Sequence, residues 1–322
     1  MSIVTFFTPV QEEMRQVEEL MRTQADEHHP ELRAALHHLL GAGGKRIRPT
    51  LGLLVGNMLG ADPDKLITLA AAVELLHTAT LVHDDLIDGA LLRRGNPTLN
   101  ARWTPAATVL TGDYVFARAA KLAAETDCLP LMRLFAETLA IIVNGEVTQL
   151  FTGRGVASRE NYDQRIYAKT ASLFEMSSRA AAMISPVNKD TVKVIQNYGY
   201  QVGMAFQIVD DILDFTGEQS EVGKPVGSDL LQGLITLPTL HYIQNHPSDP
   251  DVILLLDGKF NLERECMLRL VQSIRRSDAI SQSLSEAGKY VDEALCALAD
   301  MPVGIEKQAL EDLARYIVDR RL

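Results

Sequence analysis

The chain has 322 residues, of which 47% are hydrophobic and 23% charged, a composition typical of a globular protein and not of a disordered one. Its net charge of −11 argues against a nucleic-acid partner, and three widely spaced cysteines argue against a disulfide framework and favour a reducing compartment. The start lacks a signal-peptide pattern, and no run reaches about 18 apolar residues. We therefore expect a cytoplasmic protein with no transmembrane segment.

Helical periodicity dominates the sequence, and no segment shows the alternation expected of a strand. The predicted helices cover, in chain order, residues 66–82, 108–125, 131–151, 171–184 and 194–215. Breaker residues occur at 41–49, 93–98, 185–190, 216–233 and 245–251. Because no linker or shift in composition divides the chain, we predict an all-α fold with one domain over residues 1–322. The 216–233 stretch is long for a connection, and such loops are often functional lids.

The first acidic cluster, DDLID, follows the apolar helix predicted over residues 66–82 and contains Asp84, Asp85 and Asp88. Positions four apart share a helical face, so Asp84 and Asp88 are stacked one turn apart. Such paired carboxylates suit Mg²⁺, which takes hard oxygen ligands, usually a few carboxylates plus substrate phosphates. For one cluster alone, a solvated polar helix end is the simpler interpretation.

A second cluster, DDILD, repeats this spacing in Asp210, Asp211 and Asp214, again at the end of a strongly apolar helix. If the two clusters faced each other with nothing between them, their charges would repel. Divalent ions and a diphosphate between them would balance those charges. The spacing lacks the alternating acidic pattern of a calcium loop. Together the clusters predict a site for magnesium and a diphosphate.

Basic residues occur in two clusters of this acidic chain. GGKRIRP contributes Lys45, Arg46 and Arg48, and RRG contributes Arg93 and Arg94 directly after the first aspartates. Arginine offers a planar fork for phosphate oxygens, and lysine offers a point charge. Each cluster alone could be a solvated loop, but together they predict anion binding. Further donors could come from Lys169, Thr170, Gln207 and Lys224.

His77 lies seven residues before Asp84, about two helical turns away on nearly the same face. A single histidine on an apolar helix is commonly a satisfied core residue, so from the residues alone a core role and a ligand role both stay open. The adjacent pairs His28-His29 and His37-His38 diverge by about 100° on a helix and are poor chelators, which predicts surface positions.

Six segments, in this order, resemble the trans-isoprenyl diphosphate synthases: GGKRIRP, ELLHTATLVHDDLID, LRRGNPT, AKTASLF, FQIVDDILDF and GKPVGSDLLQGLITLP. They run from about residue 41 to 240, and the ending ARYIVDRRL is similar to that family's tail. The resemblance implies an antiparallel helical bundle around a deep cavity, usually in a homodimer. It also implies two to three Mg²⁺ ions, with isopentenyl diphosphate condensed onto an allylic primer, farnesyl or geranylgeranyl diphosphate, and diphosphate released.

The resemblance also implies a role for individual residues. The principal metal ligands would be Asp84, Asp88 and Asp210, supported by Asp85, Asp211 and Asp214. Isopentenyl diphosphate would be bound by Lys45, Arg48, His77 and Arg94. The allylic diphosphate or its leaving group would be bound by Arg93, Lys169, Thr170, Gln207 and Lys224, with both lysines acting catalytically on the leaving charge.

Two features of the resemblance concern the edge of the site. Loop 216–233 and the arginines at positions 320 and 321 would close it, since water must be kept from the allylic carbocation. Many relatives carry a lysine where this chain has Leu234, and a basic residue near Leu231. One outer contact to diphosphate is therefore expected to be missing.

Product length would be set beneath the first aspartates. Thr80 and Ala79 lie one turn below Asp84, where a bulky aromatic would floor the cavity, and both are small. Deeper on the same helix are Leu76 and Val73, the latter about 16 Å from Asp84 at 1.5 Å per residue. We predict an all-trans product that is at least of geranylgeranyl length. Within that limit, the favoured range is hexaprenyl to decaprenyl. Candidate floor residues on a facing helix are Leu134, Phe135 and Leu139.

Other functions share parts of this pattern. A terpene cyclase typically pairs one aspartate motif with an Asn/Ser/Glu motif, and a head-to-head synthase is not expected to carry GGKRIRP. A non-catalytic subunit of a heteromeric synthase commonly loses aspartates, whereas none is missing here. A shorter-chain geranylgeranyl diphosphate synthase is the alternative within the same class. We expect a cytoplasmic enzyme that contacts a membrane surface where the apolar product is released.

Overall fold

The computed structural model describes residues 5–26, 29–41, 43–93, 95–151, 158–217, 226–257 and 264–320. Within these ranges the regular structure is helical apart from one two-stranded hairpin, which confirms the all-α prediction. The chain divides into two compact units. Unit 1 contains Met1–Thr138, Leu173–Gly199 and Ala297–Asp312, and unit 2 contains Leu139–Ser172, Tyr200–Cys296 and Leu313–Leu322.

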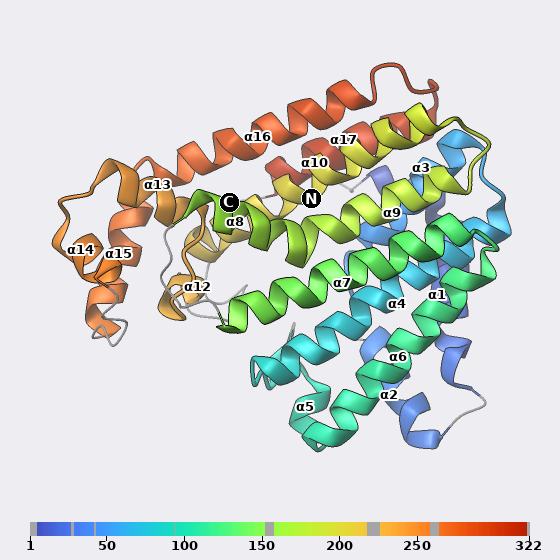
Figure 1. Cartoon of the computed structure of the whole chain (residues 1–322), viewed down its shortest axis with the longest axis horizontal. Helices are drawn as coiled ribbons and strands as arrows, with labels where there is room; N and C mark the ends of the chain where they lie inside the picture. Colours follow the sequence, from blue (N-terminus) through green and yellow to red (C-terminus); the bar gives the residue numbers. More distant parts are fainter. Residues whose placement is uncertain are drawn as a thin grey trace. The chain divides into compact units, whose positions relative to one another are not determined.

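Unit 1 contains the helices and the hairpin of the N-terminal part of the chain, labelled in Figure 1 where there is room. They are η1 (Thr5–Val10), α1 (Gln11–Arg22), η2 (Thr23–Ala25), α2 (Pro30–Gly41), α3 (Ile47–Leu59), α4 (Pro63–Ile87), β1 (Leu92–Arg93), β2 (Asn96–Pro97), α5 (Leu99–Arg102) and α6 (Pro105–Glu125). Helix α9 (Ser172–Met183) joins them from its second residue onward.

Elements that lie in unit 2 are α8 (Arg159–Ile166), the π-helical turn η3 (Tyr167–Ala171), α12 (Ser228–Leu231), α13 (Leu237–Asn245), α14 (Pro250–Leu256) and α15 (Arg264–Arg276). Helix α16 (Ala279–Ala297) belongs to unit 2 except for its last residue, Ala297, which belongs to unit 1. The unit boundaries also fall within α7 (Leu129–Phe151), α10 (Lys189–Thr216) and α17 (Ile305–Asp319).

Helix α4 forms the centre of unit 1 and packs against α6, α3 and α1, with α6 running alongside it in Figure 1. It starts where Asp62 accepts a hydrogen bond from the Lys65 amide (3.1 Å) and Pro63 takes the first helical position. Its side chains are buried around most of the circumference, as the uniformly apolar sequence predicts for an internal helix. Gly56 of α3 faces Leu66 so closely that a Cβ there would lie 2.3 Å from the leucine Cδ1.

Two of the described helices, α4 and α7, are long and apolar enough to cross a membrane. Most of the apolar stretch of α4 is buried inside the protein, as in the core helix of a folded domain. Helix α7 keeps much of its apolar surface exposed, including Val143, Val147 and Leu150. The exposed face of α7 therefore needs a separate explanation.

The predicted helices agree with the observed ones, with differences confined to their ends and connections. Helix α3 already starts at Ile47, inside the stretch predicted as a breaker, because Pro49 is compatible with a first helical turn. The expectation of no strand is wrong for residues 92–97, where two two-residue strands pair antiparallel. Helix α12 lies in the C-terminal part of the predicted lid 216–233. Residues 218–225 of that lid lie outside the described residues.

Candidate active site

The end of α4 gathers the first acidic cluster. Two hydrogen bonds terminate the helix, from Gly89 N to Leu86 O (3.2 Å) and from Ala90 N to Asp85 O (2.8 Å). Gly89 has φ +62°, so this is the glycine-dependent reversal of a Schellman motif. The clustered carboxylates thus lie in the last turn, with Asp84 half-buried and Asp88 exposed.

Asp85 is the buried member of the first cluster, and it pairs with an arginine. After the Gly89 reversal, β1 brings Arg93 back against it, with Arg93 Nε at 2.9 and 3.0 Å from the two carboxylate oxygens and Nη2 at 2.8 Å from Oδ1. Gly95 (φ +77°) forms the turn of this hairpin. Arg93 and Asp85 were predicted to contact diphosphate and metal separately, whereas the structure pairs them.

The electrostatics of this helix end favour a cation. Carbonyl groups at a helix C-terminus carry partial negative charge, so carboxylates in the last turn are unfavourable unless a positive partner is present. Arg93 offsets the charge of Asp85. Asp84 and Asp88, one turn apart, supply hard oxygen donors of the kind that Mg²⁺ binds. The donor set therefore fits a divalent metal, although no group of three or more His, Cys, Asp or Glu among the described residues forms a ready-made metal cage.

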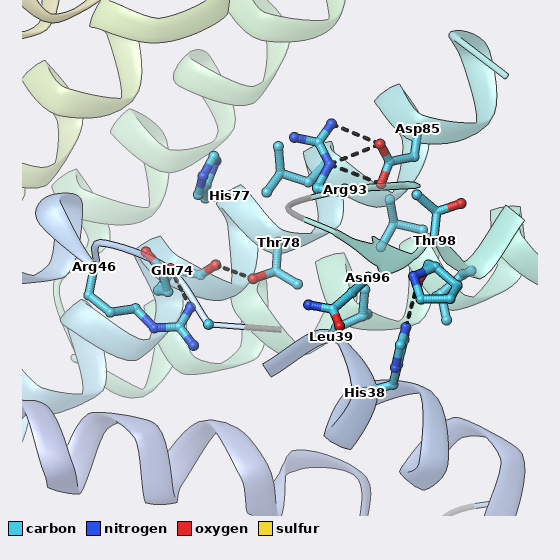
Figure 2. Close-up of a pocket in the computed structure, with 15 residues that line it drawn as sticks. His38, Leu39, Arg46, Glu74, His77, Thr78, Asp85, Arg93, Asn96 and Thr98 are labelled. Carbon is cyan, nitrogen blue, oxygen red and sulfur yellow. Dashed lines mark hydrogen bonds and ion pairs between the residues drawn. The ribbon is translucent and has the colours of Figure 1, made fainter. Parts of the chain in front are cut away.

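A pocket of about 60 Å³ opens beside α4 within unit 1. Figure 2 shows Arg46 and Glu74 at one end of the pocket, Arg93 and Asp85 at the other, and His77 between them. Residues with opposite charge thus alternate along one wall. Arg46 of GGKRIRP and Arg93 of the RRG segment thus line the same pocket, each paired with a carboxylate.

Arg46 has a structural role that its sequence neighbours do not share. Its Nη1 lies 2.6 Å from Glu74 Oε1, its Nε lies 3.3 Å from Glu18 Oε1, and its Nη2 donates to Leu40 O (3.2 Å). Burial alone would lower the pKa of Arg46, but the attraction of Glu74 and Glu18 outweighs this and the pKa is raised. Arg46 also has φ +46°, a strained conformation for a side-chain-bearing residue. The buried ion pair holds this turn, and with it the start of α3.

Arg48 and His77 lie next to each other behind that turn. Arg48 Nη1 is 3.2 Å from His77 Nε2, and because arginine has no acceptor, this contact requires an unprotonated Nε2. The guanidinium of Arg48 lies 4.7 Å from the ring centroid of Phe174, and its carbonyl accepts a hydrogen bond from Ser177 of α9 (2.7 Å). His77 therefore contacts a charged residue that is itself predicted to bind diphosphate, and its own role as a ligand stays a prediction.

The second acidic cluster lies in the last two turns of α10, and protein groups contact each of its carboxylates. Asp214 accepts hydrogen bonds from Ser228 and Asp229 at the start of α12, including Ser228 Oγ at 2.7 Å and Asp229 N at 3.1 Å. Asp210 Oδ1 lies 2.8 Å from Nη1 of Arg320. The side chain of Asp210 is still 39% exposed, which leaves room for a further ligand.

Asp211 is the buried member of this cluster. Tyr162 OH donates to its Oδ2 (2.8 Å) and Gln207 Nε2 donates to its Oδ1 (2.8 Å). Burial, together with the nearby charge of Asp229, raises the pKa of Asp211 to about 7, although both hydrogen bonds act in the opposite direction. Gln207 in turn accepts from Thr170 Oγ1 (2.6 Å), so a continuous chain of hydrogen bonds links η3 to α10.

The π-helical turn η3 places Thr170 and Lys169 on different partners. Lys169 Nζ lies 3.1 Å from Glu146 Oε1 of α7. This pair forms because α7 approaches η3 at Gly145, where a Cβ would lie only 2.5 Å from the Ala168 Cβ. Local π-helical turns often occur at functional sites, and this one falls on the AKTASLF segment that carries the family resemblance.

The structure gives the surroundings of several further predicted site residues, whose roles stay predictions. Lys45 is exposed before α3, Ala79 is buried, and Thr80 donates a hydrogen bond to His77 O (2.8 Å). Leu76 and Val73 are fully buried in α4. Arg94 and Lys224 lie outside the described residues, as does the arginine at position 321.

Sequence reasoning missed four residues with defined contacts. Glu74 and Tyr162 carry no motif signal of their own, and Arg320 was considered only as part of a closure. His38, predicted to lie at the surface, lines the pocket with Nε2 2.7 Å from Pro97 O (Figure 2). Glu74 lies within ELLHTATLVHDDLID, three residues before His77, so a buried carboxylate on an apolar helix was the available signal.

Comparison with known proteins decides the family. The family model for polyprenyl synthetase matches residues 29–268. This chain belongs to the polyprenyl synthetase family. The resemblance to trans-isoprenyl diphosphate synthases is thereby confirmed, and with it the prediction of a prenyltransferase enzyme.

Individual relatives agree with this assignment. The chain is 40% identical over 304 residues to heptaprenyl diphosphate synthase component 2 of Geobacillus stearothermophilus, covering 94% of each chain. Its fold is similar to that of heptaprenyl diphosphate synthase from Staphylococcus aureus (TM-score 0.92, 33% identity, 97% and 99% coverage). It is also similar to polyprenyl synthase from Caulobacter crescentus CB15 complexed with calcium and isoprenyl diphosphate (TM-score 0.91, 36% identity, 98% and 97% coverage).

Proposed function

We propose that this chain of the polyprenyl synthetase family is an all-trans polyprenyl diphosphate synthase. It condenses isopentenyl diphosphate onto an allylic diphosphate and releases diphosphate, with a product between hexaprenyl and decaprenyl. The observation that carries the proposal is the end of α4, where Asp84 and Asp88 accompany the Asp85–Arg93 pair on the same unit as Arg48 and His77. Relatives named as heptaprenyl and octaprenyl synthases support this range of chain lengths.

We infer that Mg²⁺ ions, two or three in number, bind at the two acidic clusters. Asp84, Asp88 and Asp210 would hold them, with Asp85, Asp211 and Asp214 fixing the geometry through their protein partners. The metal supplies a positive charge that stabilises the departing diphosphate. The Caulobacter relative, complexed with calcium and isoprenyl diphosphate, supports the use of a divalent ion.

The side chains of this protein would bind the two substrates and orient them for reaction. Arg93, Lys169 and Lys224 would stabilise the negative charge that develops on the leaving diphosphate when the C1–O bond of the allylic substrate breaks. Lys45, Arg48, His77 and Arg94 would hold isopentenyl diphosphate so that C4 of its double bond attacks C1. The proton lost from C2 passes to the released diphosphate, so no protein base is required. Loop 216–233 would keep water away from the allylic cation.

Product length provides a direct test of the cavity hypothesis. Replacing Ala79 by Tyr should shorten the product, because an aromatic ring one turn below Asp84 blocks the growing chain. The conservative change Ala79→Ser is the matched control and should leave the product unchanged. Chain lengths are measured by chromatography of the dephosphorylated products. If Ala79→Tyr gives the same product as the unmodified chain, the residues Val73, Leu76, Ala79 and Thr80 do not set its length.

Turnover distinguishes the proposed function from its alternatives. The purified chain is incubated with Mg²⁺, isopentenyl diphosphate and farnesyl or geranylgeranyl diphosphate. With farnesyl diphosphate as primer, a product of hexaprenyl to decaprenyl length supports the proposal, and a geranylgeranyl product alone supports the shorter-chain alternative. A hydrocarbon would indicate a cyclase. No turnover by the chain alone would indicate a subunit of a heteromeric synthase, an alternative that the name of the Geobacillus relative, component 2, keeps relevant.

We propose a cytoplasmic homodimer in which residues 1–322 form one catalytic domain. The family match spans both compact units, which supports a single domain. The exposed stripe Val143, Val147 and Leu150 on α7 recurs at helical spacing, as expected of a helix face covered by a second copy. Sedimentation analysis of the purified chain tests this, and substitution of Val147 by Glu should dissociate the dimer.

A further inference from the structure

Arg320, at the end of α17, makes an unusually complete set of contacts with one turn of α10. Its Nη1 lies 2.8 Å from Asp210 Oδ1, and its Nη2 donates to Phe206 O (3.0 Å). The guanidinium carbon also lies 4.0 Å from the centroid of the Phe206 ring. Phe206 and Asp210 are four residues apart, so they present one face of α10 to this arginine.

Burial makes this ion pair asymmetric. The side chain of Arg320 is 5% exposed, whereas that of Asp210 is 39% exposed. A guanidinium taken out of water is unfavourable unless a carboxylate and hydrogen-bond acceptors compensate it. Asp210 provides the negative charge, and the carbonyls of Phe206 and Ile317 accept the other hydrogen bonds. Asp210 therefore balances the charge of a guanidinium that the end of α17 holds away from water.

We propose that Arg320 is the resident counter-cation of Asp210 and competes with a divalent ion for this carboxylate, so that metal binding at the second acidic cluster is coupled to release of the end of α17. The inference rests on the proposed function, since it requires Asp210 to be a metal ligand. A metal ion and a guanidinium on one carboxylate repel each other, so metal alone binds weakly while Arg320 is in place. A metal that arrives with diphosphate brings negative oxygens that offset this repulsion.

This coupling has an expected order of events. Asp88 is exposed, whereas Asp210 pairs with a buried arginine, so we expect the first cluster to accept metal before the second. The second cluster fills when diphosphate is present. Coupling between two equilibria is reciprocal, so the factor by which Arg320 weakens metal binding equals the factor by which metal weakens docking of Arg320.

Binding of Mn²⁺ alone tests the competition. Free Mn²⁺ is measured by electron paramagnetic resonance in titrations of the full chain, of Arg320→Gln, of Asp210→Asn and of Arg315→Gln. Arg315 is exposed on the same helix, which makes it the matched control. Arg320→Gln should raise the affinity of one Mn²⁺ site about tenfold, within the usual range of coupling factors. Arg315→Gln should leave this affinity unchanged, and Asp210→Asn should remove the site.

Amide exchange tests the release without altering Arg320. Asp210→Asn, free of metal, should speed hydrogen exchange of residues 316–320, and Mn²⁺ with inorganic pyrophosphate should do the same in the unmodified chain.

Arg320→Lys keeps the charge but loses the fork and the ring contact, and it should give an intermediate Mn²⁺ affinity. These two measurements keep the test valid if Arg320→Gln does not fold.

The outcomes separate this inference from the proposed function. If Arg320→Gln binds Mn²⁺ no more tightly than the unmodified chain while Asp210→Asn removes the site, Arg320 does not compete with metal and the inference is wrong. The metal site would then remain. If no Mn²⁺ site depends on Asp210, even with pyrophosphate, the inference also fails, and the turnover assay shows whether prenyl transfer itself is lost.

Discussion

Helices α4 and α10 end on the same pattern, DDxxD, but their carboxylates have different surroundings. At the end of α4, Arg93 binds Asp85, while Asp88 is exposed and Asp84 half-buried. At the end of α10, the aspartates contact Arg320, Tyr162 with Gln207, and Ser228 with Asp229. The comparison teaches that one sequence motif yields a cluster accessible to a new ligand in one case and a cluster already held by protein groups in the other.

Removal of divalent metal should have the largest effect, since both acidic clusters are proposed to bind it. With EDTA we expect turnover to fall to background and to return when excess Mg²⁺ is added. The fold should survive, because the second cluster has protein partners that do not require a metal. Turnover and far-ultraviolet circular dichroism are measured on the same sample. Loss of helical signal with EDTA would show that metal is needed to fold the protein and not only for its chemistry.

Substitution of Asp84 by Asn tests the acidic cluster at the end of α4, the more accessible of the two. Removing the charge of a residue proposed as a principal metal ligand should lower kcat by about 10²–10³-fold, the usual cost of losing one preorganised electrostatic contact in a transition state. Asp292→Asn, at an exposed position of α16, is the control and should retain full activity. Steady-state kinetics at several Mg²⁺ concentrations provide the measurement. A variant that recovers full kcat at high Mg²⁺ would show that Asp84 affects only metal affinity.

Much of this architecture follows from the sequence, and the contacts that do not follow have a common cause. Five of the apolar helices and both acidic clusters were predicted because apolar periodicity and spacing are local signals. The contacts of Asp211 with Tyr162 and of Asp210 with Arg320 join residues 49 and 110 positions apart, which no local pattern encodes. The same applies to Arg46, since nothing in GGKRIRP shows that its middle cation turns back to Glu74, 28 residues away.

The short hairpin was missed for a different reason. Strands of two residues are too short to show alternation, and what defines this hairpin is Gly89 and Gly95 at positive φ together with the Asp85–Arg93 pair. Its function is to return Arg93 to the end of α4. A basic residue soon after an acidic cluster was visible in the sequence, but whether it would face the substrate or the aspartates was decided by the turn.

Substitution of Tyr162 by Phe sharpens the comparison at the end of α10, with the smallest expected effect. The change removes one hydrogen bond to a buried carboxylate, which should cost about 1.5–3 kcal/mol of stability if Asp211 is charged. It should also lower kcat about tenfold, because Asp211 then relies on Gln207 for its orientation. Both quantities are measured, by denaturant unfolding and by steady-state kinetics.

Tyr198→Phe is the matched control for this change. Tyr198 is also fully buried and donates its hydroxyl proton to Leu310 O (2.7 Å), a neutral acceptor in unit 1. Its loss should cost about 0.5–1.5 kcal/mol and leave kcat unchanged. If both variants lose stability and neither loses activity, the hydrogen-bond network around Asp211 stabilises the fold and does not orient a metal ligand. If only Tyr162→Phe loses activity, the second cluster depends on protein partners for its chemistry, in contrast to the exposed end of α4.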